Sequence, residues 1–263
     1  MRAERLGSVA HGGRLARVRA PRLALRAVLP GTPWGREWLV TLSHPRALIM
    51  RVAVPLLLAV PLVAGGAPTF WAAMLLSVLV AMVGAVGSGI TLARARASGH
   101  LARLAITPGA AWSTVGAWVL AAAAVDLMQL TPALGVAALG GGGGWAAAGA
   151  LLLCAAAALL VANVLGCALA MLAGGAAEVL LDVSVVLAPL LFLGGLFTGV
   201  PRTGWRWPVA RIDPFSHLHS SLIGALGGSR TFGAAEDAAW ALLWAALALA
   251  ALVPLSGQLL RRR

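Results

Sequence analysis

Lysine and tyrosine are absent from the 263 residues, and only eight residues are acidic. All 20 basic residues are therefore arginines, a usage that, with the many alanines and glycines, is typical of a GC-rich bacterial genome. Without lysine the chain has no P-loop, because that motif needs a lysine to reach the nucleotide phosphates. We find no soluble catalytic constellation either, so the chain is not expected to hydrolyse ATP by itself.

Cysteine is also scarce. Cys154 and Cys167 are the only two, and on one predicted helix they would lie about 20 Å apart along its axis. That separation excludes an intrachain disulfide, whose Cα atoms must lie within about 7 Å. We interpret both cysteines as small apolar fillers.

Charge is low, at 11% of residues, whereas hydrophobic residues reach 60%. A soluble domain has about 25% charged and roughly 45–50% apolar residues. The apolar residues form runs near 20 long, the length that crosses a hydrocarbon layer of about 30 Å. The formal charge of +12 could suggest nucleic acid, but most arginines lie before the first run or flank the others, so membrane topology explains them better.

We therefore predict an all-α membrane protein with six transmembrane helices, an N-terminal interfacial amphipathic helix, and short re-entrant or interfacial helices between spans five and six. A glycine-rich turn is expected at 140–144. The expected spans within the permease domain 48–260 are 48–64, 70–92, 110–138, 145–172, 179–200 and 238–260.

The N-terminal region divides into two parts. Residues 1–31 are rich in arginine and glycine without apolar periodicity, which predicts a flexible cytoplasmic tail. In 32–47, Trp34, Trp38 and Leu42 recur at helical spacing, which favours an amphipathic helix in the membrane interface over an ordinary polar leader.

Arginine distribution predicts the orientation. With six spans and both termini in the cytoplasm, sixteen arginines are cytoplasmic, including the basic tail 261–263, and four are external. This favours an N-in, C-in, multi-pass protein of the bacterial cytoplasmic membrane. The absence of a repeat between the two halves speaks weakly against a secondary transporter.

Acidic residues inside spans are costly and usually face water or a partner. Asp126, placed two-thirds along the third span near Gln129, is a candidate for the path of a cationic substrate, the alternative being a water-facing position near the outer boundary. Glu178 and Asp182 are expected at the interfacial end of the fifth span.

The external segment 201–237 contains His217, His219 and Asp213. An i, i+2 histidine pair could supply two metal ligands, but a third at convincing spacing is missing. We favour interfacial polar residues and predict no metal site.

The most specific motif is the segment 94–108 between spans two and three, RARASGHLARLAITP. It resembles a loop of the ABC type-2 permease family that typically reads Glu-Arg-Glu-x-Gly-Thr-Leu-x-Arg-Leu-x-x-Thr-Pro. Ala95 and Ala97 replace the two glutamates and His100 the threonine, which puts the family's charge pairing in doubt here; a generic basic loop is the alternative. The residues in register are Arg96, Gly99, Leu101, Arg103, Leu104, Thr107 and Pro108.

A second resemblance to the same family covers the end of the fifth span, 189–201, and the Asp213-Pro-Phe segment, which forms short re-entrant helices in that family. Gly194 and Gly195 allow close helix contact there and are further candidates for the substrate path.

The resemblance implies the permease subunit of an ABC exporter, with ATP and Mg on a separate ATPase chain and a second permease copy or sister permease beside it. It implies that spans one, two and five line the substrate path, and an amphipathic or apolar cargo such as a drug, antibiotic or lipid is favoured. The candidate coupling residues are Arg94, Arg96, Gly99, His100, Leu101, Arg103, Leu104, Thr107 and Pro108.

Two other classes stay open. One is an ATPase-independent channel or secondary transporter with Asp126 as its ion site. The other is a membrane assembly factor, including a haem-export component. Transport that persists without ATP would indicate the first, and co-purification with biogenesis proteins would indicate the second.

Overall fold

The computed structural model describes residues 35, 39, 43–105, 111–142, 144–200 and 202–261, and over these residues the chain is helical without strands. This confirms the predicted all-α class. The helices are α2 (Pro45–Ala64), α3 (Thr69–Ala97), α4 (His100–Ala105), α5 (Ala111–Gly140), α6 (Gly144–Ala170), α7 (Ala176–Leu193), α8 (Arg206–Ile212), α9 (Pro214–Ala225) and α10 (Ala234–Arg261).

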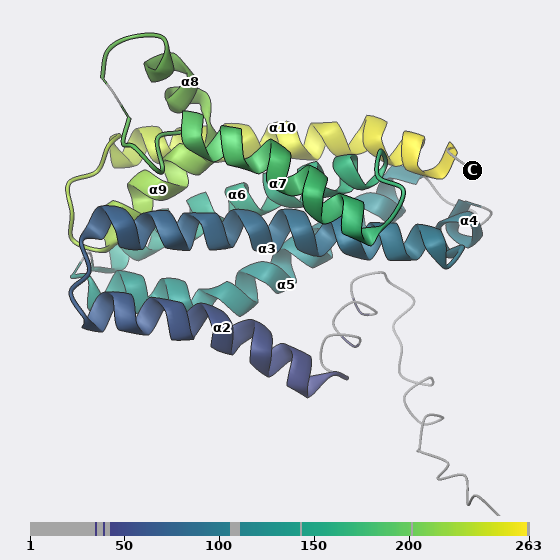
Figure 1. Ribbon diagram of the computed structural model, residues 1–263, viewed down its shortest axis with the longest axis horizontal. Coiled ribbons are helices and arrows are strands. Elements are labelled where there is room, and N and C mark those ends of the chain that lie inside the picture. Colours follow the sequence, from purple (N-terminus) through teal and green to yellow (C-terminus); the bar gives the residue numbers. More distant parts are fainter. Residues whose placement is uncertain are drawn as a thin grey trace, which may run out of the picture.

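The long helices run side by side as one elongated bundle (Figure 1). Helix α4 and the C-terminal end of α10 lie at one end of the bundle, and α8 and α9 lie at the other. We call these the α4 end and the α9 end. Successive long helices alternate in direction, so the short turns between them alternate between the two ends.

Five helices, α3, α5, α6, α7 and α10, are long and apolar enough to cross a bilayer. The apolar stretch of α2, Leu48–Ala64, is shorter. At 1.5 Å per residue the whole of α2, with 20 residues, still spans about 30 Å, so a sixth span stays a prediction.

Most predicted boundaries agree with the helices to within a few residues, but the fifth span is shorter than expected. We placed its end at residue 200, whereas α7 ends at Leu193. Gly194 and Gly195 follow, and Gly195 adopts a positive φ of 80°, a conformation that ends a helix. The predicted tail 1–31, most of the predicted interfacial helix 32–47, and the last two arginines lie outside the described residues.

Helix α6 forms the centre of the bundle and packs against α3, α5, α9 and α10. The closest approach joins α6 to α3, where a Cβ on Gly166 would overlap the carbonyl of Ala85, and a Cβ on Gly84 would lie 2.8 Å from that of Ala162. Small residues at such a crossing let two helix backbones approach closely in a membrane. The pair α3 and α6 is therefore tightly joined.

Helix α9 lies inside the bundle, although it belongs to a link between two long helices. Its residues from Pro214 to Ile223 are all buried, and it packs against α3, α6 and α10. Helix α8 is more exposed, with Ala210 its buried residue. Of the two predicted kinds of short helix, re-entrant and interfacial, the buried α9 corresponds to the re-entrant kind. Helix α8 covers that end of the bundle.

Candidate functional site

A cavity of about 680 Å³ lies between α2, α3 and α5, in the part of the bundle between the α4 end and its middle. Its walls are mostly aliphatic, with methionine and one tryptophan. The lining residues are His44, Leu48, Met50, Arg51, Val54, Pro55, Leu79, Met82, Val83, Val86, Gly87, Ser88, Thr91, Trp118, Ala122, Val125, Asp126, Gln129 and Leu130.

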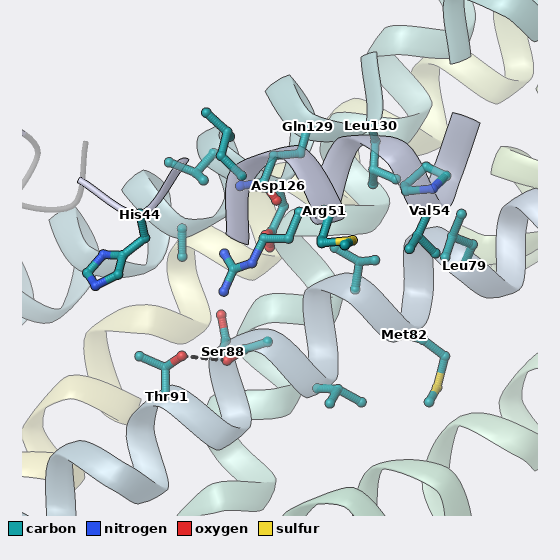
Figure 2. A pocket seen from close by; sticks show the side chains of 18 of the residues that line it. His44, Arg51, Val54, Leu79, Met82, Ser88, Thr91, Asp126, Gln129 and Leu130 are labelled. Atoms are coloured by element: carbon teal, nitrogen blue, oxygen red, sulfur yellow. Dashed lines mark hydrogen bonds between the residues drawn. The ribbon is translucent and has the colours of Figure 1, made fainter. Parts of the chain in front are cut away.

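Polar groups gather in one region of this cavity. Arg51 of α2 extends its guanidinium to the side where Asp126 of α5 and Ser88 of α3 lie, with Gln129 one turn beyond Asp126 (Figure 2). Asp126 sits near the middle of α5, not two-thirds along it. It is buried and lines the cavity, and its position relative to the membrane boundary stays a prediction.

A chain of hydrogen bonds from α3 and α6 holds the carboxyl group of Asp126 in place. Ser88 Oγ donates to Asn163 Oδ1 on α6, and Asn163 Nδ2 donates to Asp126 Oδ2 at 3.2 Å. The fully buried Asn163 thereby ties α3, α6 and α5 together. Arg51 acts on Asp126 through its positive charge without a direct ion pair between them.

Gln129 is the residue of this polar cluster with an unsatisfied hydrogen-bond donor. Its side chain is 2% exposed, and its Nε2 has no hydrogen-bond partner. A buried donor without a partner costs about 1–3 kcal/mol. The cavity therefore combines an amide donor, a guanidinium and a carboxylate with apolar walls. This combination suits a ligand that has an apolar body and a polar group able to accept hydrogen bonds.

The predicted coupling segment lies at the α4 end of the bundle. Arg94 and Arg96 are in the last turn of α3, Gly99 turns the chain with a φ of 69°, and α4 follows from His100. Leu101 is buried where α4 packs on α3 and α10. Thr107 and Pro108 lie outside the described residues, as do the side chains of Arg103 and Leu104.

The two arginines of this turn differ in their contacts. Arg96 donates from Nη1 to the carbonyls of Ala170 (3.0 Å) and Met171 (3.4 Å), and from Nη2 to that of Ala173. These carbonyls belong to the end of α6 and the turn that follows it. Both arginines are exposed, and Arg96 is distinguished by these hydrogen bonds to the backbone of α6 and its following turn. The predicted coupling role of both residues stays a prediction.

The histidines of α9 do not converge on a metal. His217 Nδ1 bonds Asp237 Oδ1 of α10 at 2.9 Å and its Nε2 bonds the Arg211 carbonyl at 2.8 Å. His219 Nε2 instead bonds the Phe70 carbonyl of α3 at 3.2 Å, and burial lowers its pKa. Both are buried, so they anchor α9 and are not exposed interfacial groups.

Asp213 begins α9 as its N-cap. Its Oδ1 accepts from the Phe215 amide at 3.3 Å, while Ser216 Oγ lies 3.1 Å from Oδ2 and 2.6 Å from the Gly194 carbonyl oxygen. Burial raises the pKa of Asp213 to about 7. The cap therefore connects the start of α9 to the end of α7.

The remaining candidates lie away from the cavity. Gly194 and Gly195 are buried in the turn that follows α7, and Gly194 lies against the start of α9. Glu178 lies in the first turn of α7 and accepts from the Gly174 amide, and Asp182 follows one turn later. Of the predicted substrate-path candidates Asp126, Gly194 and Gly195, only Asp126 lines the cavity.

Sequence reasoning missed two residues of the site. Asn163 is the only polar side chain between 146 and 170, and an isolated amide in such an apolar run is a signal for a buried hydrogen bond. Arg51 lies within the first expected span, 48–64, and nothing in its local sequence indicates that α2 turns it toward α5.

Comparison with known proteins gives one match. A family model described as ABC-2 type transporter matches residues 32–226 of the chain. No curated protein and no solved structure matches.

Proposed function

We propose, since the chain belongs to the ABC-2 type transporter family, that this multi-pass membrane permease is the transport subunit of an exporter. ATP and Mg bind a separate ATPase chain, and a second permease copy or a sister permease completes the pathway. The observation that carries this proposal is the turn at Gly99 and the short helix α4 that follows it. Helix α4 lies at one end of the bundle, where a cytoplasmic partner could bind it (Figure 1).

The proposed topology has six spans, with α2 as the first, and both termini in the cytoplasm. It supports a bacterial cytoplasmic membrane location, because sixteen of the arginines then lie on the cytoplasmic side. The α4 end is then cytoplasmic and the α9 end external. The external arginines are Arg202, Arg206, Arg211 and Arg230.

The cargo is amphipathic or apolar. The cavity supports this class, because its aliphatic walls can hold a hydrocarbon or ring system while Arg51, Asp126 and Gln129 meet a polar group. In the proposed topology the cavity lies in the cytoplasmic half of the bundle. We expected spans one, two and five around the path; this cavity uses the first, second and third, so it forms a binding place within one subunit.

The experiment that tests this function is co-expression and reconstitution of the chain with ABC-type ATPase chains from its own genome. Proteoliposomes would be assayed for movement of a fluorescent phospholipid analogue, with a Walker-lysine variant of the ATPase as control. We expect movement that needs ATP and is lost in the control. Movement that an ion gradient drives without ATP would overturn the proposal in favour of a secondary transporter, and failure of the two chains to co-purify would overturn it as well.

A further inference from the structure

The side chain of Arg96 crosses from α3 to the turn that joins α6 to α7. It donates to the carbonyls of Ala170, Met171 and Ala173. The last carbonyls of a helix have no partner within it and carry the negative end of the helix dipole. A guanidinium, with five donors in a rigid fork, is suited to hold several of them at once.

The turn that Arg96 holds is short and leads directly into α7. Ala173 is buried, Gly174 donates its amide to the Glu178 carboxylate of α7, and the extended Gly175 precedes the first residue of α7. Two consecutive glycines make this turn the most deformable link between the two helices. Arg96 is thus bonded on the α6 side of that link, three residues before α7 begins.

Helix α3 packs against both α6 and α7, and Arg96 adds polar contacts at its α4 end. Helix α3 contacts α6 closely at Gly84 and Gly166, and it contacts α7 at Gly89, where a Cβ would lie 2.6 Å from Val179 Cγ1. These contacts are nearer the middle of α3, whereas Arg96 lies at its α4 end, one turn before Gly99. The hydrogen bonds that join this end of α3 to the α6–α7 turn in the described residues come from the Arg96 side chain.

We infer that Arg96 is a positioning residue that joins the α3–α4 segment to the α6–α7 turn, so that a displacement of α4 also moves α7. This rests on the proposed function, in which a partner ATPase displaces α4. The predicted role of Arg96 as a contact for the ATPase is thereby replaced by a role inside the permease, while Arg94, which does not share these hydrogen bonds, keeps the role of partner contact.

Spin-label distances in the assembled complex test the inference without knowledge of the cargo. The background changes Cys154 and Cys167 to Ala, and labelled chain is diluted with unlabelled chain so that each distance is within one molecule. One pair, Met50→Cys with Ala102→Cys, reports on α4; the other, Met50→Cys with Leu181→Cys, reports on α7. All three positions are exposed, and each distance is measured with and without ATP.

With Arg96 intact, both distances should change on addition of ATP. With Arg96→Gln, the α4 distance should still change, while the population with displaced α7 falls by about 2- to 30-fold, the range for residues that carry coupling between sites. Arg96→Lys keeps the charge but loses the forked arrangement of donors, so the population with displaced α7 should lie between those of the parent and Arg96→Gln. This variant tests the inference if Arg96→Gln does not fold. Arg46→Gln, at an exposed position of α2 near the same end, is the control for loss of one positive charge.

An α7 response in Arg96→Gln or Arg96→Lys equal to that of the parent would overturn the inference and leave the proposed function standing. A parent complex in which neither distance responds to ATP would overturn the proposed function, and the inference with it.

Discussion

Polar side chains on α9 and polar side chains around the α2–α3–α5 cavity are both buried in an apolar bundle, yet their hydrogen bonding differs. On α9, Ser216, His217, His219, Ser220 and Ser221 all have partners. In the cavity, Gln129 Nε2 has none and Arg51 makes no direct ion pair with Asp126. Fully bonded polar groups hold one structure in place, whereas groups with open bonding capacity are suited to receive a ligand.

The bonded region is centred on Asp237. This fully buried carboxylate of α10 accepts from His217 at 2.9 Å and from Ser220 at 3.1 Å, with Arg230 at 3.5 Å. Because α9 reaches α10 through these bonds, the network fixes the re-entrant helix between the long ones. The comparison between the two regions therefore predicts opposite responses to mutation.

The largest effect is expected from Asp237→Ala. The substitution removes the acceptor that His217, Ser220 and Arg230 share, and each buried polar group left unpaired costs about 1–3 kcal/mol. The thermal midpoint of the purified protein in detergent should fall sharply, whereas Asp182→Ala, at a half-exposed position of α7, should leave it nearly unchanged. Equal midpoints for the two variants would remove the distinction between the regions.

The next effect concerns pH and sharpens the same contrast. Burial raises the pKa of Asp213 to about 7 from 3.8. A carboxyl with a raised folded-state pKa contributes stability that is fully present below its unfolded pKa and is lost as the pH rises through about 7. The free energy of unfolding should therefore decline between pH 5 and 8, by up to a few kcal/mol. Asp213→Asn, which keeps an N-cap acceptor, should flatten this part of the profile, and an identical slope in both proteins would contradict it.

A smaller effect, of opposite sign, is expected in the cavity. Gln129→Leu removes an amide whose donor is unpaired, so the protein should become more stable by about 1 kcal/mol. Movement of the fluorescent phospholipid analogue should nevertheless slow, because a hydrogen-bond donor for its polar group is lost. Asn163→Leu is the matched comparison, since that amide is fully bonded and its loss should destabilise. A destabilised Gln129→Leu protein would show that the cavity amide is satisfied after all.

The smallest effect on stability is expected at the surface of the α4 end. Arg94→Glu should change the free energy of unfolding by less than about 0.5 kcal/mol, as usual for exposed positions. Co-purification of the ATPase should fall, because like charges across an interface are unfavourable. Orientation must be checked in the same protein, since arginines set topology. Normal co-purification in a correctly oriented variant would remove Arg94 from the partner surface.

The fold could be predicted from the sequence because its main determinant is local. Runs of apolar residues near 20 long, broken by glycine, define helices whatever their neighbours, and α5, α6 and α10 begin and end close to the expected residues. The end of α7 was placed seven residues too late, because the residues after Leu193 remain apolar although Gly195 ends the helix.

The site was predicted less well, because it depends on contacts between helices. Asp126 was identified since an acid in an apolar run is unusual by itself. That Arg51 lies on the side of Asp126, or that Arg96 bonds the carbonyls at the end of α6, depends on how α2, α3, α5 and α6 pack, which the local sequence does not reveal. The family motif placed Arg96 in the predicted coupling segment but could not give the backbone carbonyls that its side chain bonds.

The crossing of α3 and α6 also constrains how this protein can diverge. Any side chain at Gly166 would meet the backbone of Ala85, and a backbone cannot be trimmed by a second mutation. In a library of all single substitutions, position 166 should accept glycine alone, whereas Ala122 and Val83, which line the cavity, should accept many residues. If the cavity binds the cargo as proposed, selection can change its lining residues one at a time without disturbing the close contact between α3 and α6.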